Sequence, residues 1–109
     1  MDRDKSVYQH FKDTNYNQRF KNSNKKTFIL KKAYRIKVKD GYIEVFEDTI
    51  YTISFKNIHK IYIHKDVEAS INELLKLAKN VPVKFIDAYG YIIGGVYAKW
   101  LYNLLWYCQ

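Results

Sequence analysis

The chain has 109 residues and carries 19 lysine and arginine residues against 11 aspartate and glutamate residues, a formal net charge of +8. This length excludes a large multidomain enzyme, whereas a hydrophobic content of 48% is sufficient for a folded core. The positive charge favours a polyanionic partner, nucleic acid first and an anionic membrane second. Frequent lysine, isoleucine, tyrosine and asparagine are also typical of AT-rich coding sequences, so the charge has a second explanation.

Residues 1–26 are interpreted as a basic N-terminal arm. They hold seven basic and three acidic residues, and their sparse apolar positions sustain no helical or strand period. We expect this arm to be partly flexible or docked through its aromatic side chains. Residues 27–65 carry the rest of the surplus charge and residues 66–109 are neutral, so the argument for a polyanion applies to the first 65 residues.

Residues 27–65 are typical of β-structure. Apolar and cationic residues alternate from Tyr34 to Lys39, which predicts a half-buried strand. The next two residues, Asp40-Gly41, predict a type I′ hairpin turn into a second strand at 42–46. Further strands are expected at 27–31, 50–55 and 58–64. Together these segments predict an antiparallel meander.

The apolar period changes after residue 65. Asp66 is a suitable N-cap, Glu68 suits the first turn, and a single apolar stripe then runs to Asn80, which predicts a helix over about 66–80. The stripe contains Val67, Ile71, Leu74, Leu75 and Ala78. Short strands are expected at 83–86 and 91–97, and residues 98–109 are suited to a C-terminal helix. The predicted fold class is α+β, mainly β: an antiparallel meander or sandwich with one packed helix.

Catalytic and metal-binding patterns are not recognisable. His59 and His64 are separated by five residues, which places them on opposite faces of a regular strand. Cys108 is the single cysteine, so no internal disulfide can form, and its terminal position in an aromatic run is poor for a nucleophile. We therefore expect no catalytic residue, no metal and no cofactor, and a protein that is not an enzyme.

A cluster of cations precedes the predicted hairpin and is the candidate nucleic-acid-binding site. Its members are Lys31, Lys32, Arg35, Lys37 and Lys39. The last three lie on one side of a strand, where such a row can follow a phosphate backbone, with Tyr42 or Phe46 nearby for base stacking. The alternatives are a solvated sheet face or an edge strand that lysines protect from aggregation.

The C-terminal segment is the candidate protein interface. Its apolar members are Trp100, Leu101, Leu104, Leu105 and Trp106, more than a thin domain can cover alone. A tail that dips into a membrane surface is a weaker alternative. The polar N-terminus does not resemble a signal peptide and no apolar run is long enough to span a bilayer, so we expect a cytoplasmic location.

The order of elements over residues 28–97 resembles the N-terminal β-domain of Cas1, the integrase of CRISPR adaptation. The resemblance rests on the Asp40-Gly41 hairpin, the paired leucines Leu74-Leu75, the strand that starts at Val81-Pro82-Val83 and the hairpin at Tyr89–Gly95. The proline that the family usually has before the strand at residue 58 is missing here.

The resemblance implies a partner rather than a reaction. In Cas1 the metal-binding residues belong to a helical domain that follows this β-domain, and the present sequence ends at Gln109, about where that domain would begin. Integrase activity is therefore not expected. In the family the β-domain supplies a homodimer contact and helps to hold DNA.

Two functions from different classes are consistent with these observations. The first is a non-catalytic module that acts through homodimerisation, or through binding a Cas1-like protein, and so assists or interferes with CRISPR adaptation in antiviral defence. The second is a small basic nucleic-acid-binding protein that uses its arm and the strand from Arg35 to Lys39. DNA is a partner under both, whereas a membrane is disfavoured.

Overall fold

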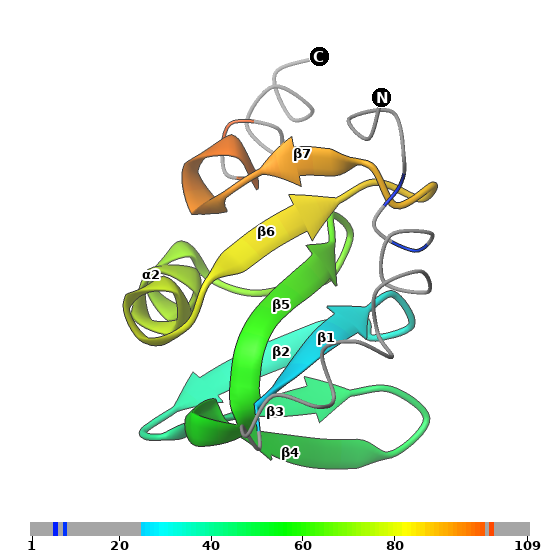
Figure 1. Ribbon diagram of the computed structural model, residues 1–109. Coiled ribbons are helices and arrows are strands. Elements are labelled where there is room, and N and C mark those ends of the chain that lie inside the picture. The colour runs from blue at the N-terminus through cyan, green and yellow to red at the C-terminus, as the bar shows by residue number, and fades with distance from the viewer. Residues whose placement is uncertain (1–5, 7, 9–24, 100, 102–109) are drawn as a thin grey trace.

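The computed structural model describes Ser6, Tyr8, residues 25–99 and Leu101 (Figure 1). Within this part of the chain, strands form two sheets and one α-helix packs beside them. The elements are β1 (Lys26–Leu30), β2 (Arg35–Lys39), β3 (Tyr42–Phe46), β4 (Ile50–Ser54), a 3-10 turn η2 (Phe55–Asn57), β5 (Ile58–His64), α2 (Ile71–Asn80), β6 (Val83–Ile86) and β7 (Ile92–Gly94). A short helical turn follows at residues 96–99. The predicted α+β, mainly β class is confirmed.

Strands β2, β3 and β4 form a three-stranded antiparallel sheet in that order. The predicted hairpin at Asp40-Gly41 is confirmed, but its turn is not type I′. Gly41 has φ +88°, whereas no described residue other than glycine has a positive φ, so Asp40 stays in the ordinary region. Type I′ requires positive φ at both central positions.

The second sheet is mixed and has the order β1-β5-β6-β7. Strand β5 pairs in parallel with both β1 and β6, and only β6–β7 is antiparallel. The antiparallel meander predicted for residues 27–65 is therefore wrong for its first and last strands. Only β2, β3 and β4 form it, whereas β1 and β5 belong to the other sheet and pair in parallel. Turn η2 redirects the chain after β4, and the crossover through α2 makes β5 and β6 parallel, as a strand–helix–strand connection requires.

A β-bulge interrupts β5 at its start. Lys26 pairs with Ile58 and Thr27 with Lys60, so His59 is an extra residue on β5. The bulge explains why both Ile58 and Ile61 are buried in one core despite a spacing of three. The regular alternation that was expected to separate His59 from His64 is therefore broken.

Helix α2 starts later than predicted. Ser70 is the N-cap, with a capping box to Glu73, and the helix runs from Ile71 to Asn80. Asp66 is not the cap, because the segment before the helix joins β2: the Ile36 N–H donates to the Glu68 carbonyl and the Glu68 N–H to the Tyr34 carbonyl, both at 3.0 Å.

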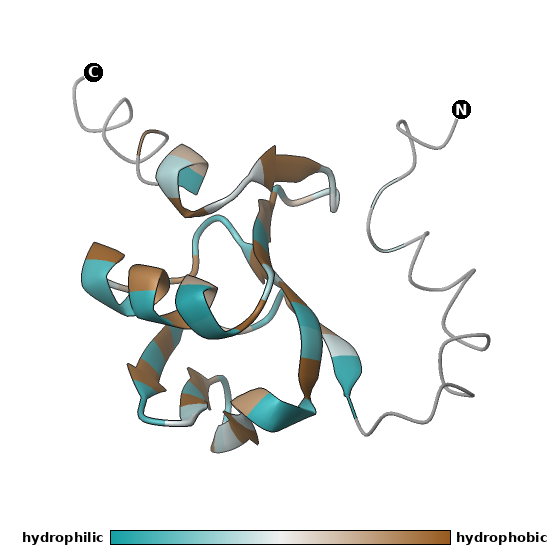
Figure 2. Ribbon diagram, turned by 60° about the vertical axis from the view of Figure 1, so that its left-hand side comes forward, coloured by the Kyte–Doolittle hydropathy of each residue, from teal (hydrophilic) through white to brown (hydrophobic). Residues whose placement is uncertain are grey.

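One hydrophobic core fills the space between the two sheets and α2. Alternate residues of the strands face inward, as the hydropathy pattern along them in Figure 2 illustrates. The core includes Ile36, Val38, Ile43, Val45 and Ile53 of the three-stranded sheet, Ile58, Ile61, Ile63, Val83 and Phe85 of the other sheet, and Leu74 and Leu77 of α2. The candidate surfaces for contacts with other molecules are therefore the outer faces of the sheets and their edge strands.

Candidate interaction surfaces

Strand β2 carries part of the predicted nucleic-acid-binding row. Its side chains alternate between buried Ile36 and Val38 and the more exposed Arg35, Lys37 and Lys39. The prediction that these three cations share one side of a strand is confirmed. Tyr42 and Phe46 pair with Lys39 and Arg35 across the sheet, so aromatic rings do lie beside the row.

Acidic residues partly neutralise this row. A guanidinium nitrogen of Arg35 lies 2.8 Å from a carboxylate oxygen of Glu68, and this hydrogen bond and charge raise the pKa of Arg35. Lys37 pairs across the sheet with Glu44 and lies 5.7 Å from the centre of the Phe46 ring. The row is thus a mixed surface rather than an uninterrupted cationic one.

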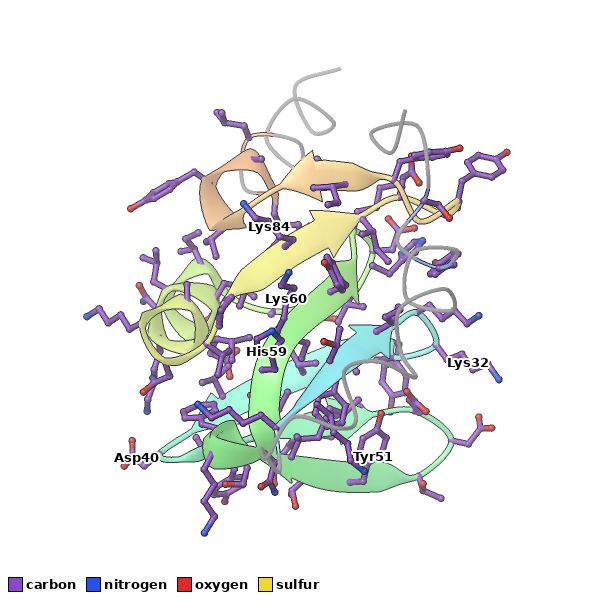
Figure 3. The ribbon with its side chains drawn as sticks, in the orientation of Figure 1. Lys32, Asp40, Tyr51, His59, Lys60 and Lys84 are labelled. Atoms are coloured by element: carbon purple, nitrogen blue, oxygen red, sulfur yellow. The ribbon has the colours of Figure 1, made fainter. Side chains whose placement is uncertain are left out.

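Lys31 and Lys32 lie apart from that row. They occupy the turn after β1, where the Lys31 ammonium is 4.9 Å from the centre of the Tyr8 ring. Figure 3 shows Lys32 on the opposite side of the molecule from Asp40, which marks the hairpin that follows Lys39. The five predicted residues therefore do not form one site.

A second cationic surface was missed. His59 and Lys60 of β5 and Lys84 of β6 project from the outer face of the four-stranded sheet (Figure 3), and we call these three residues the β5–β6 face. Lys84 pairs in register with Tyr62, and the Lys60 ammonium lies 5.8 Å from the Tyr62 ring centre. None of the three forms an ion pair with a carboxylate in the described part of the chain.

Tyr8 covers the neighbouring part of the same face. It packs with Ile29 against the buried Tyr62 and Ile86. Burial, followed by the charge of Asp87, raises the pKa of the Tyr8 phenol. Tyr8 is therefore packed on this sheet face, while the other aromatic positions of the predicted arm lie outside the described residues.

The predicted C-terminal interface is described at Leu101 alone, whose exposed fraction is 50%. The other four members, Trp100, Leu104, Leu105 and Trp106, lie outside the described residues. Just before them, Lys99 is buried. Its ammonium donates to the Lys65 carbonyl and lies 6.0 Å from the Phe85 ring centre, and burial lowers its pKa.

The two edges of the three-stranded sheet differ sharply. The β2 edge is closed: Ile36 bonds to Glu68, and the Val38 N–H donates to the Glu73 carboxylate at 3.1 Å. The β4 edge is open, since no strand of the described chain pairs with its outer side. Strand β4 is the outermost strand at the bottom of Figure 1.

The β4 edge, Ile50–Ser54, carries no charged side chain, and the side chains of its first three residues are exposed. The exposed fractions of Ile50 and Tyr51 are 60% and 37%. The Phe55 N–H donates to the Gly41 carbonyl, and hydrogen-bonding pairs alternate along an antiparallel ladder. The backbone groups of Tyr51 and Ile53 therefore bond to β3, while those of Ile50, Thr52 and Ser54 point outward.

Clusters of metal ligands and membrane-spanning helices were sought in the part of the chain that the structure describes. No three histidine, cysteine or acidic side chains gather there as metal ligands. Nor is any described helix long and apolar enough to cross a bilayer. No protein-family model, curated protein or solved structure matches this sequence, so the resemblance to Cas1 stays a prediction.

Proposed function

We propose that this protein is a non-catalytic binding module that pairs its β4 edge with a strand of another polypeptide. The observation that carries the proposal is the open edge of β4. There the backbone N–H and C=O groups of Ile50, Thr52 and Ser54 point away from β3, beside the exposed side chains of Ile50 and Tyr51. Such an edge is a template for strand addition, in which main-chain hydrogen bonds supply affinity.

The other sheet edges are less suited to this role. Strand β2 is occupied by Glu68 and Glu73. Strand β7 has three residues, ending at Gly94, and β1 starts at the charged Lys26. Folded proteins usually protect an edge with lysine, proline or a covering segment. Strand β4 has no lysine or proline within it, so its exposure is a liability unless a partner covers it.

The candidate partners are a second copy of the chain and a Cas1-type integrase. The order of elements that resembles the Cas1 β-domain supports the second partner, and a cytoplasmic role in which the module assists or interferes with CRISPR adaptation. The single cysteine is consistent with a reducing compartment.

Two matched substitutions test the proposal. Ile50 on β4 and Ile92 on β7 are exposed to similar extents, 60% and 55%, but lie on different sheets. Light scattering is recorded for the wild type, Ile50→Lys and Ile92→Lys, each alone and mixed with a purified Cas1-type integrase. We expect the wild type and Ile92→Lys to form a complex in at least one condition and Ile50→Lys to form none. A wild type that is monomeric alone and unbound in the mixture would contradict the proposal.

A second candidate function, nucleic-acid binding, is favoured by the β5–β6 face. His59, Lys60 and Lys84 are brought together from two strands, with Tyr62 between the lysines and no carboxylate paired to them among the described residues. Cations next to an aromatic ring suit contact with a phosphate backbone. This surface lies on a different sheet from the β4 edge, so both functions can coexist.

A further inference from the structure

We propose that the strand that covers β4 is β4 of a second copy of this chain, paired antiparallel with Thr52 on the two-fold axis. This inference rests on the function proposed above and names its partner. The result is one continuous six-stranded sheet across a symmetric dimer, in which each β4 changes from an edge strand to a central one.

The direction of the free backbone groups defines which registers are allowed. The groups of Ile50, Thr52 and Ser54 point outward, so these residues must form the hydrogen-bonding pairs of the new ladder. When Thr52 of one copy lies opposite Thr52 of the other, Ile50 of each copy lies opposite Ser54 of the other. All five residues of β4 then overlap, with about six new hydrogen bonds. A shift by two residues shortens this overlap.

The side chains are complementary in the same register. Tyr51 and Ile53 face the inner side of the sheet, because they pair with inward-facing Val45 and Ile43 of β3. The two-fold axis places Tyr51 opposite Ile53 of the second copy, an aromatic and β-branched pair that stabilises antiparallel sheets. On the outer side Thr52 meets Thr52, and the exposed Ile50 is covered next to Ser54.

Charges at the two ends of β4 also match. Asp48 lies in the bend four residues before Thr52, and Lys56 lies in η2 four residues after it, so the axis brings the end of one β4 that carries Asp48 next to the end of the other β4 that carries Lys56. Both residues are exposed, and neither takes part in an ion pair within the described structure. A parallel in-register pair would instead bring like charges together, which is unfavourable.

Charge reversal tests this register in solution. We expect Asp48→Lys or Lys56→Asp alone to weaken dimerisation roughly tenfold at low salt, because two like-charge contacts replace two opposite-charge contacts. The double variant, Asp48→Lys with Lys56→Asp, restores the wild-type dimerisation constant. Independent effects, in which the double variant is weaker than either single one, would overturn the register.

Cross-linking gives a second, geometric readout in a Cys108→Ser background. Residues opposite each other in a hydrogen-bonding pair have Cα atoms about 5.5 Å apart, within reach of a disulfide. Thr52→Cys is therefore expected to form a covalent dimer on mild oxidation. The matched control, Ser54→Cys, places its two Cα atoms about 14 Å apart in this register and stays monomeric under the same conditions.

The outcomes separate this inference from the proposed function. A wild type that associates in light scattering, but in which Thr52→Cys and Ser54→Cys cross-link equally, overturns the register and leaves strand pairing at β4 intact. A wild type that is monomeric alone yet binds the integrase overturns self-pairing only. Association that Ile50→Lys does not reduce overturns both.

Discussion

The backbone N–H of Val38 donates a hydrogen bond to a carboxylate oxygen of Glu73 at 3.1 Å, which joins strand β2 to helix α2. The other carboxylate oxygen of Glu73 faces the Ser70 N–H and hydroxyl, while the Ser70 hydroxyl accepts from the Glu73 N–H at 3.1 Å. One side chain thus starts the helix and closes a sheet edge. Because β2 is closed in this way, β4 remains the open edge of its sheet.

Replacement of Glu73 by alanine is expected to destabilise the fold by about 2 kcal/mol. It removes half of a capping box and leaves the Val38 N–H without its acceptor. Glu73→Gln costs less, since its amide oxygen still accepts one of the two bonds. Urea unfolding, monitored by circular dichroism, measures the free energy of unfolding of both variants. A Glu73→Ala variant as stable as the wild type would contradict this role of Glu73.

Two glycines with similar φ angles, Gly41 and Gly90, allow the packing of the Tyr8 ring to be tested by substitution. Gly41 and Gly90 have φ +88° and +89°, so alanine at either position is strained. A Cβ at Gly41 meets nothing within 4 Å, whereas a Cβ at Gly90 lies 2.8 Å from the Tyr8 ring. We expect Gly41→Ala to cost about 1 kcal/mol and Gly90→Ala clearly more.

The excess cost at Gly90 is assigned to displacement of the Tyr8 ring. In a Tyr8→Ala background the difference between Gly90→Ala and Gly41→Ala is expected to vanish, as measured by denaturant unfolding. A difference that persists without the ring would show that Tyr8 is not what the Cβ displaces.

Titration of the Tyr51 phenol makes the stability of the fold depend on pH in the alkaline range. Burial, and then its 3.0 Å hydrogen bond to Glu47, raise the pKa of Tyr51 to about 12. Since the ordinary value is about 10, the unfolded chain loses this proton first. The contribution to stability is therefore complete below about pH 10 and is lost as the pH rises towards about 12.

Phenolate absorbance measures this titration. The chain has 11 tyrosines, so the Tyr51 transition is taken as the difference between the wild type and Tyr51→Phe. Glu47→Gln removes the carboxylate and is expected to lower the pKa of Tyr51. An unchanged pKa in Glu47→Gln would mean that Glu47 has no part in the shift.

Two double charge-reversal variants, one on the β5–β6 face and one on the cationic row of β2, distinguish the two candidate nucleic-acid-binding surfaces. We expect Lys60→Glu with Lys84→Glu to weaken binding to a DNA duplex at least tenfold at low salt and to reduce the salt dependence by about two units of slope. The control, Lys37→Glu with Lys39→Glu, has a smaller effect because Lys37 already faces Glu44. A larger loss in the control would favour the β2 row instead.

Local features of the fold were predictable and long-range pairings were not. The hairpin at Asp40-Gly41 and the two-residue alternation along β2 depend on neighbouring residues, so the sequence indicates both. The parallel pairing of β1 with β5 joins residues about thirty positions apart, and no local pattern specifies it. The strand–helix–strand order around α2 does indicate parallel β5 and β6, whereas the predicted meander covered residues 27–65 and made no statement about the pairing of residues 83–86.

The sequence contains a local signal for the start of α2. Ser70 and Glu73 have the spacing of a capping box, whereas Asp66 is suited to an N-cap by residue type alone. The β5–β6 face had no such signal. Lys60 and Lys84 are far apart in the sequence, and only the parallel pairing of their strands brings them onto one surface.

Amide hydrogen exchange, resolved by residue in dilute and concentrated samples, tests the pairing at β4 most directly. The account predicts that the amides of Ile50, Thr52 and Ser54 become protected as concentration rises, because they bond to the second copy. Those of Tyr51 and Ile53 are protected at every concentration, because they already bond to β3. Equal exchange of the Ile50, Thr52 and Ser54 amides in both samples would contradict self-pairing at β4.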